Sequence, residues 1–382
     1  MYAGGNSDVI PFCRISAPGF KSFTILDVKS WDVIIVGGGI IGLSLAIVLR
    51  KRGATVLVVE RGEPGREASH AAGGMLVDAP LETRPILQTL ATTSARMYPE
   101  FVHELEFESG MKVDLRDHGT IVLTSDQHLE VAKACGLSTH TGASLSRMEP
   151  ALLCPNDHGV YLKERSVDPR ALASAAAKAA KNRGTDFSSG DPVIKVDLSA
   201  RRACGITTTK TSFLAGKVVN CAGAWSGQIS PVPLPTRPVK GQMLCLVMPS
   251  RHLLRHVVRT PEVYLIPRSD GRLLIGATVE EAGFDKRTVP DTIKRLHRSA
   301  LGVLPQLKEA KILEDWAGLR PGTPDGLPIL GPTGISGYYA ATGHFRDGIL
   351  LAPITAEIMA DVINESACGF DLSPFSIARF AS

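Results

Sequence analysis

The segment WDVIIVGGGIIGLSLAIVLRKRGATVLVVE, residues 31–60, constrains the fold more than any other part of the chain. Its pattern predicts a strand over 32–36, a glycine-rich turn, a helix that runs to residue 52 and a second strand over 55–59. The turn has the spacing Gly37-x-Gly39-x-x-Gly42. A strand, three glycines at this spacing, a helix and a second strand are typical of a dinucleotide-binding α/β fold.

Each residue of this turn has a physical role in binding a dinucleotide. Gly37 permits the tight turn, Gly39 lets the backbone approach a pyrophosphate, and Gly42 lets helix and strand pack closely. The pyrophosphate is expected at the helix N-terminus, where free N–H groups and the helix dipole favour negative charge. Glu60 ends the second strand, where it can accept hydrogen bonds from ribose hydroxyls and would repel a 2′-phosphate. The motif therefore disfavours NADP, but it does not distinguish FAD from NAD.

Composition excludes several other classes of protein. The 382 residues are 44% hydrophobic and 21% charged with a net charge of +4, which predicts an ordinary globular chain of about two domains without a nucleic-acid partner. No apolar run reaches the ~20 residues of a transmembrane helix. The seven cysteines form no Cys-x-x-Cys pair, which favours a reducing cytoplasm and gives no metal site. We expect residues 1–30 to form a mobile extension rather than a signal peptide.

Three further segments could line a flat ligand, and the first two of them carry small residues. Residues 66–80 read REASHAAGGMLVDAP, and residues 217–229, KVVNCAGAWSGQI, predict a strand that runs into small residues. The alternating segment DPVIKVDL, residues 191–198, predicts a strand that lies along an adenine or is an ordinary sheet strand. A loop packed under a helix is the alternative for the first segment.

Two histidines and Asp168 are interpreted as structural rather than functional residues. His252 and His256 are four residues apart, but Arg251 and Arg255 surround them, so we expect a solvated face rather than a metal site. Asp168 is expected to cap a helix that starts with proline and continues to residue 181.

The carboxy-terminal region combines arginines with glycines and prolines. WAGLRPGTPDGLPILGP, residues 316–332, holds Arg320 in a segment with restricted backbone, and a guanidinium is the natural partner of a carboxylate. Tyr264 lies on the first strand of a predicted hairpin that turns at residues 269–271. AATGHFRDGILLAP, residues 340–353, predicts a second strand–glycine–helix junction that carries His344 and Arg346.

Taken in order, GGGIIG, ASHAAGGML, VNCAGAWS, WAGLRPGTPDGLPILG and ATGHFRDGILLAP resemble the D-amino-acid-oxidase superfamily of FAD enzymes over residues 31–363. Within it, the chain is most similar to the bacterial glycine oxidases of thiamine biosynthesis. This resemblance implies a Rossmann-like α/β FAD-binding domain with an inserted substrate domain, built on an antiparallel sheet plus helices. The implied division is 31–80, 150–230 and 319–382 for the FAD-binding domain, and 81–149 and 231–318 for the substrate domain.

The resemblance also implies which residues meet the ligands. Arg320 and Tyr264 would hold the carboxylate of an amino acid, with Arg346 as an active-site cation and Met75 lining the small pocket beside the flavin. FAD would contact Gly37, Gly39, Ile40, Ile41, Gly42, Glu60, Arg61, Ser69, Ala71, Ala72, Gly73, Gly74, Met75, Val193, Cys221, Ala222, Gly223, Trp225, Gly343, His344, Arg346, Gly348, Ile349 and Leu350. The covalent sarcosine oxidases have a flavin-linking cysteine where this chain has residues 317–319, Ala-Gly-Leu, so the FAD is expected to be non-covalent.

The implied activity is FAD-dependent oxidation of glycine, sarcosine or a small D-amino acid by hydride transfer from Cα to flavin N5. The imine would hydrolyse to glyoxylate and ammonia, or pass to thiazole synthesis, while O2 becomes H2O2. No side chain is assigned as a general acid or base. The family further implies a homotetramer. Two alternatives stay open: a D-amino-acid dehydrogenase that reduces a quinone, and a flavin-binding subunit without amine turnover.

Overall fold

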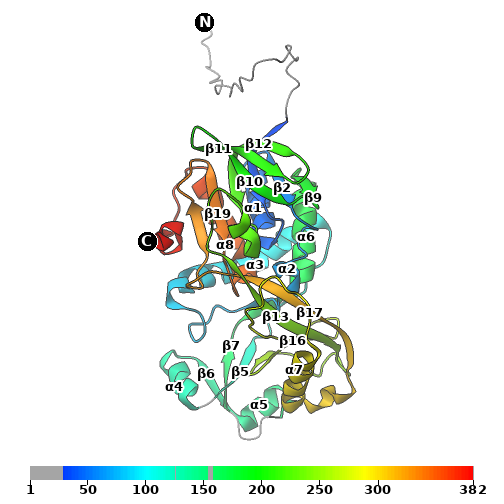
Figure 1. The fold of residues 1–382 in the computed structure, drawn as a ribbon. Coiled ribbons are helices and arrows are strands. Elements are labelled where there is room, and N and C mark those ends of the chain that lie inside the picture. Colours follow the sequence, from blue (N-terminus) through cyan, green and yellow to red (C-terminus); the bar gives the residue numbers. More distant parts are fainter. Residues whose placement is uncertain (1–28, 125, 154–157, 382) are drawn as a thin grey trace, which may run out of the picture.

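Two eight-stranded sheets form the two ends of the molecule in the computed structural model (Figure 1). The model describes residues 29–124, 126–153 and 158–381. Residues 1–28 of the expected extension, Cys13 and Cys154 lie outside the described residues. The N-terminal glycine motif belongs to the upper sheet in Figure 1, and Tyr264 and Arg320 belong to the lower one.

The upper sheet is built around the strand–turn–helix–strand unit that the sequence predicts. β1 (Ser30–Val36), α1 (Ile40–Lys51) and β2 (Val56–Glu60) form it, with β1 and β2 parallel. The other strands are β9 (Asp186–Ser189), β10 (Val193–Ser199), β11 (Arg202–Thr208), β12 (Ser212–Asn220), β18 (Ile329–Pro332) and β19 (Tyr338–Thr342). β12 lies parallel to both β1 and β19, so three strands point their carboxyl ends in the same direction.

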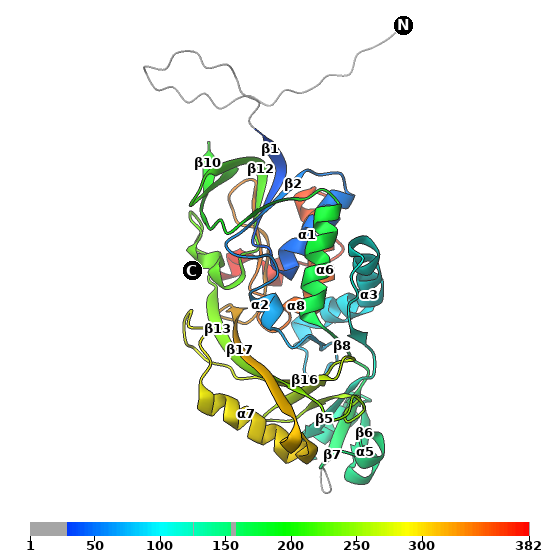
Figure 2. The same cartoon turned by 90° about the vertical axis from the view of Figure 1, so that its right-hand side faces the viewer.

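The two faces of β1 bury alternate side chains, as expected for a strand with layers on both sides. Val33 and Ile35 face a core of helices, whereas Ile34 and Val36 pack against residues of β10, β11 and β12. The helices of the first core are α1, α3 (Pro85–Ser109), α6 (Pro169–Asn182) and α8 (Gly348–Ile363). Figure 2 shows α1, α6, α3 and α8 together on this side of the sheet.

α6 begins as the sequence predicts. The Asp168 carboxylate accepts hydrogen bonds from the backbone N–H groups of Arg170 and Ala171, at 2.9 and 3.3 Å, and Pro169 occupies the first turn. Its alanines at 175, 176, 179 and 180 are buried against the sheet and neighbouring helices. Small side chains allow this helix to approach closely, which explains its Ala-rich sequence.

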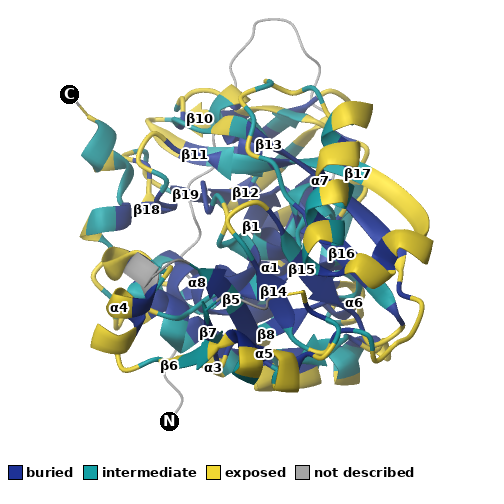
Figure 3. Ribbon diagram, turned by 90° about the horizontal axis from the view of Figure 1, so that it is seen from below, coloured by how far each residue is buried: buried dark blue, intermediate teal, exposed yellow. Residues whose placement is uncertain are grey.

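The lower sheet is antiparallel apart from one parallel pair, β5 with β14. It contains β5 (Thr120–Thr124), β6 (Ser138–Thr141), β7 (His158–Leu162), β13 (Arg237–Val247), β14 (Val257–Arg259), β15 (Tyr264–Pro267), β16 (Arg272–Gly276) and β17 (Lys311–Gly322). α7 (Pro290–Val303) packs on β13 and β16 with Ile293, Leu296 and Ala300 buried. Its opposite face is exposed, as Figure 3 shows in yellow.

Short elements complete the described chain. They are α2 (Ala68–Ala71), α4 (Asp126–Ala134), α5 (Gly142–Met148), a small sheet of β3 (Met75–Leu76), β4 (Leu115–Arg116) and β8 (Arg165–Val167), and 3-10 turns at Gly223–Gln228, Pro305–Glu309, Ser373–Phe375 and Ile377–Phe380. Across residues 29–124, 126–153 and 158–381, none of the helices combines the length and apolar character needed to cross a membrane.

The structure confirms the predicted fold class, a mixed α/β protein with a second, largely antiparallel sheet. Several elements do not follow the proposed division into domains. The end of β17, residues 319–322, falls in the range 319–382 but pairs with β13 of the lower sheet. α3 falls in the range 81–149 but packs on α6 and α8, because its buried face continues the helical core of the upper sheet. β7 falls in the range 150–230 but pairs with β5 and β6 of the lower sheet.

Candidate active site

A cavity of about 1270 Å³ lies at the carboxyl ends of the three parallel strands and reaches the lower sheet. The register pairs Val36 with Asn220, and Asn220 with Ala340, so β1, β12 and β19 end close to one another. Each strand is followed by a glycine-containing turn, and ligands of open α/β sheets bind at this edge. The volume exceeds the ~300–1,000 Å³ of a typical small-molecule pocket, which leaves room for a large cofactor and a small substrate.

The first glycine turn requires glycine for steric reasons. A Cβ at Gly37, where φ is +106°, would lie 2.5 Å from the carbonyl oxygen of Cys221. A Cβ at Gly42 would overlap the carbonyl oxygen of Gly37. Gly39 is the N-cap of α1, and the next N–H, that of Ile40, donates to the Ser69 hydroxyl at 2.9 Å. The first turn of α1 lines the cavity through Gly39, Ile40 and Ile41, and a helix N-terminus at this place favours an anionic ligand.

Glu60 lies beside this turn and is 6% exposed. Its two carboxylate oxygens accept hydrogen bonds from the N–H groups of Gly38 and Gly62, each at 2.8 Å. A carboxylate has about four acceptor positions, so both oxygens keep capacity for hydroxyl donors. The next residue, Arg61, stacks on the Trp225 ring at 4.2 Å, and Phe284 packs on the same ring at 5.3 Å between centroids.

Residues 71–75, a strip of small residues, form another wall of the cavity, and contacts with neighbouring segments hold this strip in place. A Cβ at Gly74 would overlap the carbonyl oxygen of Val167, and a Cβ at Gly73 would lie 2.8 Å from the Ile266 side chain. Buried Arg268 donates to the Gly73 carbonyl oxygen at 2.6 Å. Met75 packs beside Tyr264 in a small apolar cluster. The strip therefore contacts β8 through Val167 and the strand β15 that carries Tyr264.

The turn after β12 supplies Cys221, Ala222, Gly223 and Trp225 to the wall, and β10 supplies Val193. Burial raises the pKa of the Cys221 thiol, which favours the thiol over the thiolate. Ser226 in the same turn hydrogen-bonds the Thr342 hydroxyl at 2.7 Å. This bond joins the turn after β12 to the end of β19.

The turn between β19 and α8 is the second strand–glycine–helix junction. Gly343 has φ of +75°, and a Cβ there would lie 2.5 Å from the Thr323 methyl carbon. His344 is 3% exposed and its Nε2 lies 3.1 Å from the Thr355 hydroxyl; burial lowers its pKa to about 3, so the ring is neutral. Phe345 has φ of +48° and donates its N–H to the Pro321 carbonyl oxygen at 3.0 Å. The junction is thereby attached to the residue after Arg320.

Arg320 extends from β17 into the cavity, near Tyr264 of β15. Its Nη1 donates to the carbonyl oxygens of Thr278 at 3.0 Å and Lys240 at 3.4 Å. Burial lowers the pKa of Arg320, and burial raises the pKa of Tyr264 against the opposing effect of the charge of Arg320. At neutral pH the site therefore holds a guanidinium cation and an uncharged phenol.

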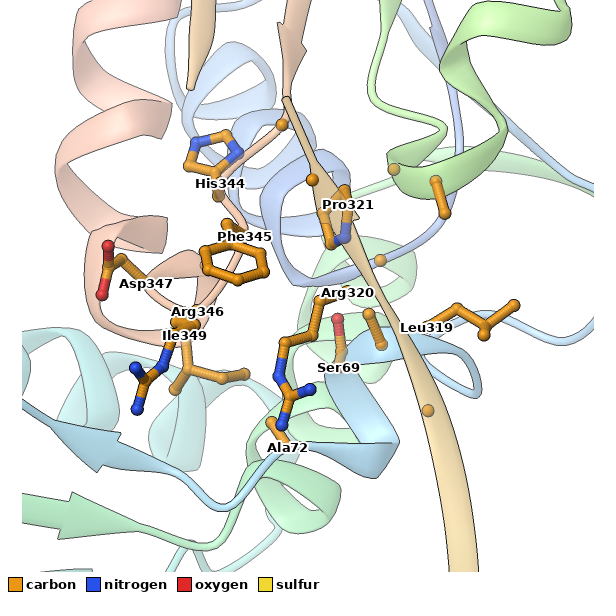
Figure 4. A pocket seen from close by; sticks show the side chains of 18 of the residues that line it. Ser69, Ala72, Leu319, Arg320, Pro321, His344, Phe345, Arg346, Asp347 and Ile349 are labelled. Carbon is orange, nitrogen blue, oxygen red and sulfur yellow. The ribbon is translucent and has the colours of Figure 1, made fainter. Parts of the chain in front are cut away.

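Arg346 adds a second positive charge to the same part of the cavity. In Figure 4, Arg320 and Arg346 extend in similar directions with Ile349 between them. Within the described part of the chain, neither guanidinium has a carboxylate oxygen within 4.0 Å. Two arginines that face one cavity without an ion-pair partner favour a negatively charged ligand.

The predicted site residues converge, although they come from eight separate stretches of chain. Every one of them except Gly42 lines this single cavity. Gly42 instead packs against the turn itself. Sequence reasoning missed several other wall residues: Gln228, Gly241, Met243, Arg259, Phe345 and Asp347. Phe345 and Asp347 lie within the segment 340–353 that the sequence analysis singled out, and Gly241 had a signal of its own, because an isolated glycine in a strand often marks a close approach.

One structural reading of the sequence was wrong. His256 does not lie on a solvated face: its Nδ1 is 2.5 Å from the carboxylate of Glu149, which is 1% exposed. The N–H groups of Arg255 and His256 donate to the same carboxylate. His252 is exposed as expected. The sequence spacing could not reveal Glu149, which lies more than 100 residues away.

Comparisons with known proteins agree with this geometry. Residues 32–362 match the model of the DAO family, described as FAD dependent oxidoreductase. The chain is 35% identical to the bifunctional protein ThiO/ThiG of Trichormus variabilis and 33% identical to a glycine oxidase of Pseudomonas aeruginosa, each over 91% of its length. These matches cover 55% and 98% of the two relatives, so the chain spans about half the length of the ThiO/ThiG protein.

A solved structure shows the same fold. The glycine oxidase of Geobacillus kaustophilus superposes with a TM-score of 0.87 at 32% identity, covering 92% of this chain and 99% of that one. The chain therefore belongs to the family of FAD dependent oxidoreductases.

Proposed function

Starting from membership of the FAD dependent oxidoreductase family, we propose that this protein oxidises glycine, with sarcosine and small D-amino acids as further candidate substrates. FAD, when bound, would accept the substrate hydride and would then reduce O2 to H2O2. The products would be glyoxylate and ammonia after hydrolysis of the imine. The observation that carries the proposal is the pair Arg320 and Tyr264, which face one cavity with the dinucleotide motif.

The residues present fit FAD. The first turn of α1 offers N–H groups for a pyrophosphate, and Glu60 offers acceptors for ribose hydroxyls. The glycines at 73 and 74 let backbone form a flat wall where a Cβ would meet other atoms. Among the described cysteines, Cys221 alone lines the cavity, and its raised pKa opposes a thiolate linkage. We infer that FAD is held without a covalent bond.

The chain contributes binding and orientation of the substrate. Arg320 would bind the substrate carboxylate through charge-assisted hydrogen bonds, because only its Nη1 donates to backbone carbonyl oxygens among the described residues. The Tyr264 hydroxyl, neutral at pH 7, would donate a further hydrogen bond. Fixing the carboxylate fixes the direction of the Cα–H bond, and good alignment can lower a barrier by roughly 7–11 kcal/mol. We assign no side chain as a general base.

Wider roles are proposed on the strength of the relatives. Glycine oxidases similar over nearly their whole length, and ThiO/ThiG proteins, support a role in forming the thiazole precursor of thiamine. We further propose that the protein works in the cytoplasm as a homotetramer. Sedimentation or light scattering of the purified holoenzyme measures the oligomeric state directly.

A substrate panel with peroxide detection tests the proposed function. Glycine, sarcosine, D-alanine and D-proline are supplied in air to the wild type, to Arg320→Ala and to Arg287→Ala. Arg287 is a suitable control because its side chain is exposed and forms an ion pair with nearby Asp285. We expect Arg320→Ala to lower kcat/KM about 100-fold, since losing one partner of a desolvated charge pair costs about 2–5 kcal/mol.

The outcomes separate the alternatives. The proposal is supported if glycine yields peroxide, if Arg287→Ala keeps the wild-type activity and if Arg320→Ala loses most of it. An unchanged KM in Arg320→Ala would refute the carboxylate role of Arg320. Flavin that glycine bleaches but air does not reoxidise, until a quinone is added, would indicate a dehydrogenase.

A further inference from the structure

Gly241, in the middle of β13, lies directly beneath the guanidinium of Arg320. A Cβ built on Gly241 would lie 2.6 Å from Cζ of Arg320 and closer still to both terminal nitrogens. Real Cβ atoms essentially never come this close to another heavy atom. Gly241 also lines the cavity, so its hydrogen atom occupies a place that any other side chain would fill.

The backbone on this side cannot move away easily. β13 lies between β16 and β17, and Gly241 pairs with Gly318 of β17. On one side of it, Lys240 exchanges two backbone hydrogen bonds of 2.9 Å with Glu280. On the other side, the Gln242 N–H donates to the Thr278 hydroxyl at 2.9 Å, and the Gln242 side chain accepts from Val289 at 2.7 Å. The strand is therefore fixed on both flanks of the glycine.

The arginine, in contrast, can move. The atoms that a Cβ would meet are the far end of a flexible side chain, held by the carbonyl oxygens of Thr278 and Lys240. Gly241 has no left-handed φ, so alanine suits its backbone. Alanine there would leave the strand intact and displace the guanidinium by about 1 Å, a shift that can cost about 100-fold in rate when it misplaces a reacting group.

The side chain of Tyr264 lies over a second strand glycine, as that of Arg320 lies over Gly241. A Cβ at Gly276 would lie 2.6–2.7 Å from Cε2, Cζ and the hydroxyl oxygen of Tyr264. Gly276 pairs with Tyr264 across β15 and β16, and with Met243 of β13. Both side chains that face the proposed carboxylate therefore rest on strand glycines of the same sheet.

We propose that Gly241 is a positioning residue that sets the depth of the Arg320 guanidinium and thereby the affinity for short amino-acid carboxylates. The proposal rests on the proposed function, in that it takes Arg320 as the carboxylate partner. In this proposal Gly241 has no side chain with which to bind the substrate. It acts by leaving the space in which the guanidinium lies.

A double-mutant cycle tests the proposal. The wild type, Gly241→Ala, Arg320→Ala and the double variant are compared as holoenzymes for glycine oxidation, and acetate is titrated against the flavin absorbance as a carboxylate probe. The control is Gly216→Ala in β12, where the nearest atom to a new Cβ is an ordinary 3.7 Å away. We expect Gly241→Ala to lose roughly 10- to 100-fold in kcat/KM and a similar factor in acetate affinity, with flavin content unchanged.

The cycle distinguishes positioning from a general structural role. In the Arg320→Ala background, Gly241→Ala should have no further effect, because the group it displaces is gone. An equal loss in both backgrounds, or a Gly241→Ala variant indistinguishable from Gly216→Ala, would overturn the proposal. If Arg320→Ala itself keeps the wild-type KM, the proposed function of Arg320 fails, which is a separate result.

An Arg320→Lys pair keeps the test valid if Gly241→Ala accumulates poorly. Lysine has a single terminal nitrogen and lacks the second one that the new Cβ would meet. We expect the cost of Gly241→Ala to fall below about threefold in the Arg320→Lys background, because the planar fork that the methyl group displaces is absent. A cost in that background as large as in the wild type would contradict a steric effect on the guanidinium.

Discussion

The two strand–glycine–helix junctions, β1–α1 and β19–α8, face the same cavity but are built differently. At the first, a Cβ on Gly42 would overlap the carbonyl oxygen of Gly37, so helix and turn touch backbone to backbone. At the second, a Cβ on Gly348 would lie 3.5 Å from His344 Cβ, an ordinary contact. At the glycine that lies in the helix, the first junction depends on the absence of a side chain, whereas the second has room for one.

The second junction carries polar groups where the first carries glycines. It holds buried His344, exposed Arg346 and half-buried Asp347, and burial raises the pKa of the Asp347 carboxyl. The first junction has no titratable side chain between Gly37 and Gly42. The same local pattern thus serves two purposes: close approach of backbone at one place, and placement of charge at the other.

Replacing the two equivalent glycines should break this comparison most strongly. Gly42→Ala sets a Cβ against backbone, which cannot turn aside as a side chain can, so we expect FAD affinity to fall at least about 100-fold. Gly348→Ala, the matched change at the second junction, should stay within about twofold of the wild type, because an ordinary contact of the new methyl group costs little. Fluorescence titration of the apoproteins with FAD measures both. Equal affinities for the two variants would contradict the steric difference.

Removing the charge of the second junction should have a smaller effect. Arg346→Gln is expected to raise the KM for glycine about tenfold and to weaken its salt dependence, because an exposed cation contributes about 1 kcal/mol to an anionic ligand. FAD content should not change. Steady-state kinetics at two salt concentrations provide the measurement. A loss of FAD with an unchanged KM would instead place Arg346 against the cofactor.

The smallest effect is expected from His344, and it depends on pH. Its pKa is about 3 in the folded protein, below the ordinary value of 6.5, so between these values the unfolded chain binds a proton that the folded one does not. The free energy of unfolding should therefore fall as pH decreases below 6.5, by about 1 kcal/mol per pH unit. His344→Gln should lose this part of the pH dependence.

Urea unfolding of the wild type and of His344→Gln checks the sign of this pH dependence. The two pH values are about one unit above and one unit below the ordinary histidine pKa. The difference in stability between the two proteins should shrink or reverse at the lower pH. A difference that is the same at both pH values would show that His344 does not titrate between the folded and unfolded states as proposed.

Elements with a strong local signal were predictable from the sequence. The strand–turn–helix at residues 31–60, the Asp168 cap and the helix that begins at Gly348 follow from period, glycine spacing and capping chemistry, which act within a few residues. The wall of the cavity was also foreseen in outline, because its residues lie in the turns after predicted strands. Contacts between distant segments were not predictable from the sequence. Examples are the packing of α3 in the helical core and the contact between His256 and Glu149.

The sequence by itself determined the dinucleotide fold, the family and which turns would line the cavity, since each depends on local patterns of glycines and charged residues. Only the tertiary structure decided that Arg320 of β17 lies over Gly241 of β13, with Tyr264 over Gly276. Strand pairing brings these residues together across long stretches of chain, and the register that does so is set by the packing of the whole sheet.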